Sequence, residues 1–513
     1  MKQLNTTRYF IALLVLSFCL AACQSFVDGV DPLTSRVEDE LLTTEDQVPF
    51  LITGVLGGYG ISDEGEGVPW LIWRIAGYSD EKIHGMFDGA PDHFTFVQDG
   101  PADLDFYEND WDNYHTIRFF ADDLVARVGA IGSFDDTALR DRALWWGNFI
   151  GGLMRMYLAD HWGAQAEQGN TPGAPITTRE QLDNGEFGAF FSSTELRQQA
   201  RDKFNAAMGF DPGDVDNPDE VLWSFIARTH IFDGNDAQAK TAAESGLQQG
   251  ESFGIFHTSR FENYMWNSAG RGNDPLFSAH PRFAQYVLDD AKEGVVLSEL
   301  TADDVADGKV SRFGRPIEGG DGQPGHRDTV DPRAGLANQD ERLPLWERPI
   351  RSLYGQIRTS TWADYSSGTG LSQDIYHNRD GEFFLIDWRE MELILAEVAI
   401  NGGDDATGLI HINNVRSFHS LDEITPAEMA AYDNPLGGAS TTGIALRGDL
   451  PVNNITGALG LLIEERDKTL WMKGTRIADQ ARFNLWHLPA GKFRNYMPIP
   501  RSETNVNPNV PGN

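Results

Sequence analysis

The N-terminal segment constrains the fold most, because it contains both cysteines of the chain. Lys2 and Arg8 precede an apolar run over residues 10–20, and small residues follow that run. A run of about 11 apolar residues is too short to span a bilayer, which takes about 20. The pattern predicts a secretory signal over residues 1–22. About 490 residues then remain without a disulfide, so packing alone must stabilise them, and that length allows a sizeable core.

The second cysteine, Cys23, directly follows Leu20, Ala21 and Ala22, while Cys19 lies inside the apolar run. A cysteine at this position resembles the lipobox of bacterial lipoproteins. The resemblance implies that a lipid is attached to Cys23, which becomes the mature N-terminus, and that residues 23–45 form a lipidated tether. The alternative is an ordinary secretory signal that is cut elsewhere.

The charge balance excludes one class of partner. The formal net charge is −36 at pH 7, and phosphate backbones are bound by basic surfaces, so we expect no nucleic-acid partner. An acidic peptide ligand is disfavoured for the same reason. Abundant Asp and Glu with few Lys is typical of proteins from salty habitats, and the alternative is an acidic surface that keeps the protein soluble by self-repulsion.

The apolar residues follow a helical period in most of the chain, which predicts a mainly α fold. The expected helices cover residues 46–58, 111–128, 139–162, a stretch from 194, 217–232, 235–249, 387–401, 404–418 and 458–474. Between them, irregular segments are expected at 61–110, 166–191, 250–382 and 420–456, and the tail from 488 is expected to be extended. In the long helix after residue 139, Gly147, Gly151 and Gly152 would let a neighbouring helix pack closely.

Two of the expected helix pairs share a pattern at a spacing of 169 residues. Ala227, Gly234, Asp236 and Ala237 match Ala396, Gly403, Asp405 and Ala406. Each unit is a helical hairpin with a Gly at the end of one helix and an Asp at the start of the next, as in tetratricopeptide repeats. We therefore expect tetratricopeptide-like helical hairpins that carry long irregular loop insertions.

No set of residues in the chain is typical of an enzyme. The sequence has no His-Glu-x-x-His, no Gly-x-Ser-x-Gly and no phosphate-binding loop, and the body has no cysteine nucleophile. The acidic loop from Asp211 to Glu220 is the best candidate for a structural calcium site, but its spacing does not fit an EF-hand, and solvated turn residues are the favoured interpretation. His411 and His419 are expected to be structural or exposed.

Aromatic residues in the expected loops are the strongest sign of a ligand. Flat rings with a few polar neighbours suit a sugar, whose CH groups lie on the ring while carboxylates and amides bind its hydroxyls. The alternative for each ring is that it fills a gap beneath a loop. The candidate ligand-binding residues are Trp70, Trp73, Tyr78, Tyr264, Trp266, Trp362 and Tyr365.

The C-terminal half resembles the SusD/RagB family. The resemblance rests on the segment from Trp388 to Glu397, on Ile412 to Arg416, on Leu462 to Arg482, and on the tail from Tyr496 to Asn509. Within the third segment, Glu465 and Arg466 are expected to pair with Arg476, Asp479 or Arg482. Lys473 departs from the family, which often has Glu before this Gly, so one ion pair of the family is in doubt.

The resemblance implies one SusD-like α-helical domain over residues 46–513, with an N-terminal part (46–249), a loop-rich ligand region (250–382) and a C-terminal part (383–513). Family members are outer-membrane lipoproteins at the cell surface. They bind glycans and pass them to a SusC-like, TonB-dependent β-barrel transporter without hydrolysing them, and they need no cofactor. The alternatives are a peptide-binding member of the same family, an exported glycoside hydrolase and a structural scaffold without a ligand.

Overall fold

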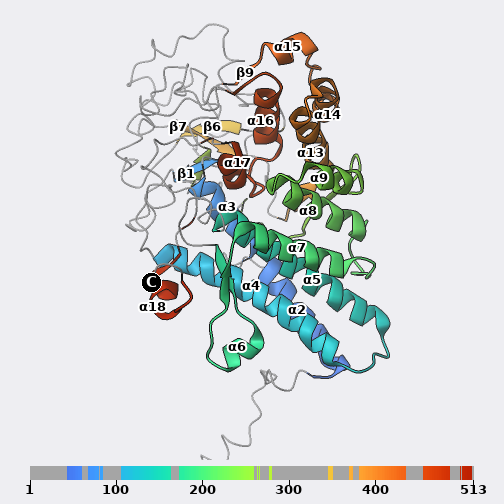
Figure 1. Ribbon diagram of the computed structural model, residues 1–513, viewed down its shortest axis with the longest axis vertical. Helices are drawn as coiled ribbons and strands as arrows, with labels where there is room; N and C mark the ends of the chain where they lie inside the picture. Colours follow the sequence, from blue (N-terminus) through green and yellow to red (C-terminus); the bar gives the residue numbers. More distant parts are fainter. Residues whose placement is uncertain are drawn as a thin grey trace, which may run out of the picture. The chain divides into compact units, whose positions relative to one another are not determined.

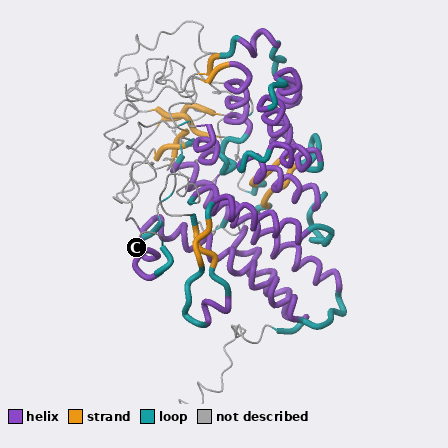
Figure 2. The backbone as a smooth tube through the Cα atoms, viewed as in Figure 1, coloured by secondary structure: helices purple, strands orange, loops and turns teal. Residues whose placement is uncertain are grey.

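The computed structural model describes residues 43–60, 67–79, 81–84, 105–162, 173–258, 263, 265, 277–279, 342, 345–349, 369–373, 380–434, 455–483, 485, 497 and 499–510. The chain divides into two compact units, residues 1–47 and 48–513. In the first unit the described residues include a short 3₁₀-helix, η2 (Glu45–Gln47). The second unit is mainly helical, as predicted, and its described strands form short pairs (Figure 2).

Four helices at the start of the second unit lie side by side (Figure 1): α2 (Val48–Gly60), α4 (Asp105–Ala130), α5 (Thr137–His161) and α7 (Ser193–Ala207). Helix α5 is central, and nearly all its residues from Ala143 onward are buried. The predicted close approach at Gly152 is confirmed, because a Cβ there would lie 2.7 Å from the Phe204 ring of α7. No helix in the described ranges is both long and apolar enough to cross a membrane.

The two predicted hairpins are present, and they pack against each other. They consist of α8 (Pro218–Phe232) with α9 (Asp236–Glu244), and of α13 (Trp388–Asn401) with α14 (Asp405–Phe418). Arg228 of α8 donates two hydrogen bonds to Glu390 of α13, at 2.7 and 2.6 Å. A segment and its copy 169 residues later are thus joined by a buried ion pair.

The corner glycines Gly234 and Gly403 have φ angles of +70° and +79°, in the left-handed region that glycine adopts without strain. We expect Gly403→Ala to lower the free energy of unfolding by about 1–2 kcal/mol, since no atom crowds the position and backbone strain is the only cost. Gly402→Ala is the matched control, because Gly402 has a helical φ of −76°. Urea unfolding of both variants checks this, and equal stability would contradict it.

The C-terminal part adds α15 (Pro426–Ala430), α16 (Gly457–Thr469), α17 (Arg476–Phe483) and α18 (Arg501–Val506). The predicted pairing of Arg466 with Asp479 is confirmed at 3.0 Å, and Arg482 pairs with Asp479 at 2.8 Å. Glu465 was expected to take part, but it pairs instead with Arg342 and Arg416.

Lys473, the departure from the family pattern, has a partner of its own. Its ammonium group pairs with Asp387, whose side chain also caps the N-terminus of α13 by accepting the backbone N–H of Arg389. Burial opposes the charge of Asp387, but Lys473 and Arg389 hold the pKa of its carboxyl below the ordinary range. The Lys at this position is thus part of a buried ionic cluster.

Several expected irregular segments contain regular structure. Residues 68–78 form α3 (Val68–Tyr78), although a loop is expected there from the sequence; nearly all its residues are buried. The expected loop 166–191 contains β2 (Ala174–Ile176), α6 (Arg179–Asp183) and β3 (Ala189–Phe191), and α18 interrupts the expected extended tail.

The strands form five antiparallel pairs in the described part of the chain. Besides β2 with β3, the pairs are β1 (Lys82–His84) with β5 (Phe277–Ala279), β4 (Ser252–Ile255) with β8 (Phe383–Asp387), β6 (Leu345–Pro349) with β7 (Thr369–Gln373), and β9 (Asp433–Asn434) with β10 (Ile455–Thr456). Short ribbons of this kind cannot bury a core of their own. The helices therefore carry the core, and the pair of β4 with β8 joins the two ends of the expected insertion 250–382.

Candidate functional site

Three of the aromatic ligand candidates lie on α3, and two of them are core residues. The side chains of Trp73 and Tyr78 are only 3% and 2% exposed, so neither ring offers a face to a ligand. Trp70 is partly exposed, and its ring stacks on Trp73 with centroids 4.8 Å apart, while the Arg74 guanidinium lies 5.3 Å from the Trp70 ring centre. We therefore reassign Trp73 and Tyr78 to the core, whereas Trp70 stays a prediction.

The other predicted site residues lie outside the described residues. These are Cys23, Tyr264, Trp266, Trp362 and Tyr365. The lipidation of Cys23 and the ligand role of the four aromatic residues therefore stay predictions.

The acidic loop at residues 211–220 uses its carboxylates locally. Asp211 accepts the N–H of Gly213 at 2.8 Å, Asp219 accepts the N–H of Gly209 at 3.0 Å, and Asp214 pairs with Arg142 at 3.3 Å. Over the described ranges, no group of three or more His, Cys, Asp or Glu side chains could hold a metal ion. Nothing in this loop supports the calcium hypothesis.

The two histidines of the second hairpin have structural partners. The ring of His411 lies 2.8 Å from the Glu392 carboxylate, and the ring of His419 lies 3.0 Å from the Arg389 guanidinium. Both contacts hold α14 against α13, in agreement with the structural role expected for these residues.

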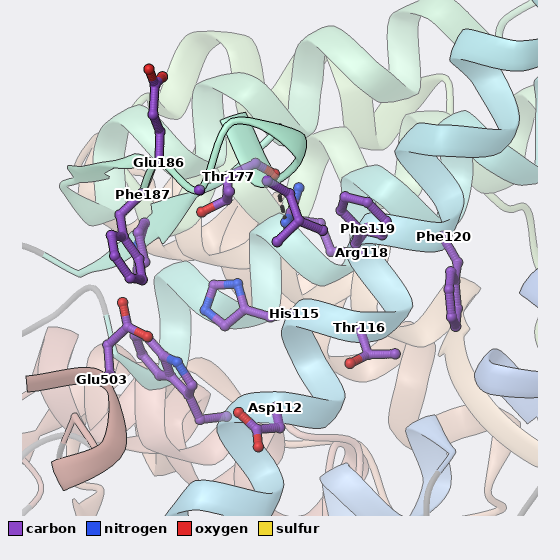
Figure 3. A pocket seen from close by; sticks show the side chains of 14 residues that line it. Asp112, His115, Thr116, Arg118, Phe119, Phe120, Thr177, Glu186, Phe187 and Glu503 are labelled. Atoms are coloured by element: carbon purple, nitrogen blue, oxygen red, sulfur yellow. Dashed lines mark hydrogen bonds between the residues drawn. The ribbon is translucent and has the colours of Figure 1, made fainter. Parts of the chain in front are cut away.

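A pocket of about 560 Å³ lies against α4 (Figure 3). One wall is a face of that helix. It carries one row of residues four positions apart at 111, 115 and 119, a second row at 112, 116 and 120, and residue 118 beside them. The opposite wall comes from the β2–α6–β3 segment, and α18 contributes one carboxylate. Its described lining residues are Trp111, Asp112, His115, Thr116, Arg118, Phe119, Phe120, Pro175, Thr177, Leu182, Gly185, Glu186, Phe187 and Glu503.

The floor of the pocket carries little free positive charge. Arg118 is only 2% exposed, and its terminal nitrogens donate to Asp122 at 2.9 Å and to the Thr177 carbonyl at 3.0 Å. Its pKa falls to about 10, chiefly because it is buried, which still leaves it charged at pH 7. Burial, helped by the nearby Arg118 and Arg155, lowers the pKa of His115 well below its ordinary value, so this imidazole is neutral.

Two carboxylates, Asp112 and Glu503, reach the same pocket from different elements. Burial raises the pKa of Asp112, and the negative charges of Glu108 and Glu503 raise it further. Glu503 accepts a hydrogen bond from the Asn507 amide on the following turn. The pocket surface therefore offers mainly hydrogen-bond acceptors.

Two kinds of contact hold the pocket wall that the β2–α6–β3 segment forms: the close approach of its strands and hydrogen bonds from the C-terminal tail. A Cβ at Gly188 would clash with the carbonyl oxygen of Ile176, so the two strands can approach this closely only with glycine there. The side-chain amide of Asn509 donates to the carbonyls of Phe187 and Gly188 at 2.9 and 3.1 Å. Residues after α18 thus hold the wall that faces α4.

No sequence motif indicates this pocket. Its residues come from three segments that meet only in the folded chain, and no motif joins them. The available signal is the polar and aromatic mixture on α4, where Asp112, Thr116 and Phe120 lie four residues apart and are all exposed.

Comparison with known proteins identifies the fold. No protein-family model matches the sequence, and no curated protein matches it. Among solved structures, a SusD-like carbohydrate-binding protein from Bacteroides vulgatus has a TM-score of 0.57 at 14% identity, covering 91% of this chain and 97% of that one. A SusD-like carbohydrate-binding protein from Bacteroides fragilis has a TM-score of 0.54 at 14% identity, covering 92% and 100%.

A SusD superfamily protein from Bacteroides thetaiotaomicron has a TM-score of 0.54 at 16% identity, covering 91% of this chain and 99% of that one. At identities this low, the similarity establishes the fold and not the ligand. The chain therefore has the SusD-like fold, which confirms the mainly α prediction and supports the family resemblance.

Proposed function

We propose that this protein is a cell-surface, glycan-binding lipoprotein that delivers oligosaccharide to a SusC-like, TonB-dependent transporter of the outer membrane and does not cleave its ligand. The observation that carries the proposal is the SusD-like fold, shared over nine-tenths of the chain with proteins described as carbohydrate-binding. The N-terminal Leu-Ala-Ala-Cys sequence supports a lipid anchor at the membrane.

The anchor can be tested by metabolic labelling with an alkyne analogue of palmitate in the native cells. We expect label on the parent chain and none on the Cys23→Ser variant, together with surface accessibility to protease in intact cells. An unlabelled parent chain would contradict the lipoprotein assignment.

Ligand capture can be tested with the mature lipoprotein in detergent, by affinity electrophoresis against a panel of polysaccharides and by calorimetry with their oligosaccharides. We expect retardation by at least one polysaccharide, and copurification of a β-barrel protein from native membranes. Binding to none of the polysaccharides would contradict the proposed function.

The alternative function that the pocket allows to be tested on named residues is an exported glycoside hydrolase. Such an enzyme needs two carboxylates on opposite sides of one cleft, and Asp112 and Glu503 both line the pocket. Each polysaccharide that binds should therefore be incubated with the protein and assayed for new reducing ends. Release that Asp112→Asn and Glu503→Gln abolish would establish the hydrolase in place of the binding protein.

A further inference from the structure

Building on the proposed function, we infer that the pocket between α4, the β2–β3 hairpin and α18 binds an uncharged, hydroxyl-rich sugar unit and not an anionic glycan. Its volume of about 560 Å³ lies within the range of roughly 300–1,000 Å³ that small-molecule sites occupy. The pocket is also built from three separate segments, one of which is held in place by Asn509.

The first argument is the placement of exposed rings. Phe187 and Phe120 are 38% and 47% exposed, although residues of this type are usually buried. In Figure 3 they lie at opposite ends of the pocket, with His115 and Thr116 between them. Rings in this arrangement provide flat apolar surfaces for the CH faces of a sugar.

The second argument is the excess of acceptors. Asp112 and Glu503 contribute carboxylates to the lining, whereas the carboxylate of Glu186 points away from the pocket in Figure 3, and an ionised carboxylate only accepts hydrogen bonds. A suitable ligand must therefore supply donors. Sugar hydroxyls do so, and they can also accept from the hydroxyl of Thr116, which is exposed beside them.

The third argument concerns charge. Arg118 contributes the one cation among the described lining residues, and its side chain is 2% exposed and already bonded to Asp122 and to the Thr177 carbonyl. A uronate or a sulfate ester would meet the carboxylates of Asp112 and Glu503. The nearest further cation, Arg179 on the Phe119 ring, is already paired with Asp123 at 2.9 Å. Electrostatic repulsion therefore disfavours anionic polysaccharides at this site.

The test compares neutral polysaccharides (xylan, laminarin, starch), anionic ones (alginate, pectate, a carrageenan) and a lysine-rich peptide as ligands for the mature protein. We expect neutral polysaccharide to bind. Phe187→Ala and Asp112→Asn should each weaken that binding by about three- to tenfold, as the loss of one ring or charge-assisted contact implies. Phe256→Ala is the matched control, since Phe256 is exposed (78%) but does not line the pocket.

Each outcome separates this inference from the proposed function. Neutral binding that is unaffected by Phe187→Ala and Asp112→Asn would overturn the pocket assignment and leave glycan capture intact. Binding only to anionic polysaccharides would overturn the ligand class. Binding only to the peptide would overturn both, and so would the absence of any binding.

Discussion

Replacing Arg228 by Met should lower the free energy of unfolding by about 3–5 kcal/mol, because it leaves Glu390 charged and unpaired inside the protein. The side chains of Arg228 and Glu390 are each 1% exposed, and Arg228 also donates to the Leu385 carbonyl at 2.9 Å. Burial alone would lower the pKa of Arg228, but Glu390 holds it above its ordinary value. Unfolding in guanidinium chloride measures the effect. The dependence of the unfolding free energy on denaturant concentration should be equal in parent and variant, so that the two free energies can be compared.

The double variant Arg228→Met/Glu390→Leu should recover most of that loss, since apolar groups of similar volume can replace a buried ion pair at little cost. Lys240→Met is the matched control. It removes a pair with Glu244 on the neighbouring helix α9, where both side chains are more than half exposed, and should change stability by less than about 0.5 kcal/mol. An Arg228→Met variant within 1 kcal/mol of the parent would contradict the role of this pair.

Acidification should destabilise the protein through His161. Burial lowers the pKa of His161 to about 3, against an ordinary value of 6.5, and a backbone hydrogen bond with Gly474 only partly opposes this. Between these two values the unfolded chain binds a proton that the folded chain does not. The stability present above pH 6.5 is therefore lost as the pH falls, by about 3 kcal/mol between pH 7 and pH 4.5.

The variant His161→Asn isolates this contribution, because its amide oxygen can still accept from the Tyr114 hydroxyl, which lies 2.7 Å from Nδ1 of His161. We expect it to be less stable at pH 7 and to lose less stability on acidification. Asp110 instead stabilises the folded protein on acidification, because burial raises the pKa of its carboxyl to about 6 despite Arg74. This contribution is the same in parent and variant, so it cancels in the comparison. A His161 ring that titrates near pH 6.5 by NMR would refute the prediction.

The helical hairpins could be predicted because each carries its own boundary signals. Gly234 and Gly403 end one helix, an acidic residue begins the next, and the apolar period continues on both sides. That the copies pack against each other could not be inferred, since Arg228 and Glu390 lie 162 residues apart and neither sequence segment indicates the other.

Helix α3 shows why the sequence pattern places two core residues, Trp73 and Tyr78, among the ligand candidates. Residues 61–110 are rich in Gly, Asp and Pro, which favours a loop, and this composition hides a helix of 11 residues that is buried on nearly all sides. Trp73 and Tyr78 lie outside every helix expected from the sequence, whereas in the structure both are buried residues of α3. The pocket was missed for a related reason, since α4, the hairpin and Glu503 come together only through tertiary packing.

The support that Asn509 gives to the hairpin wall has a consequence for the order in which the protein matures. The amide that binds the Phe187 carbonyl belongs to a residue 322 positions later in the chain. A ribosome must therefore add that residue long after the hairpin itself has been synthesised. A growing chain that has not reached it lacks the contact that holds this wall, so the pocket is complete only after residue 509 has folded back onto the hairpin.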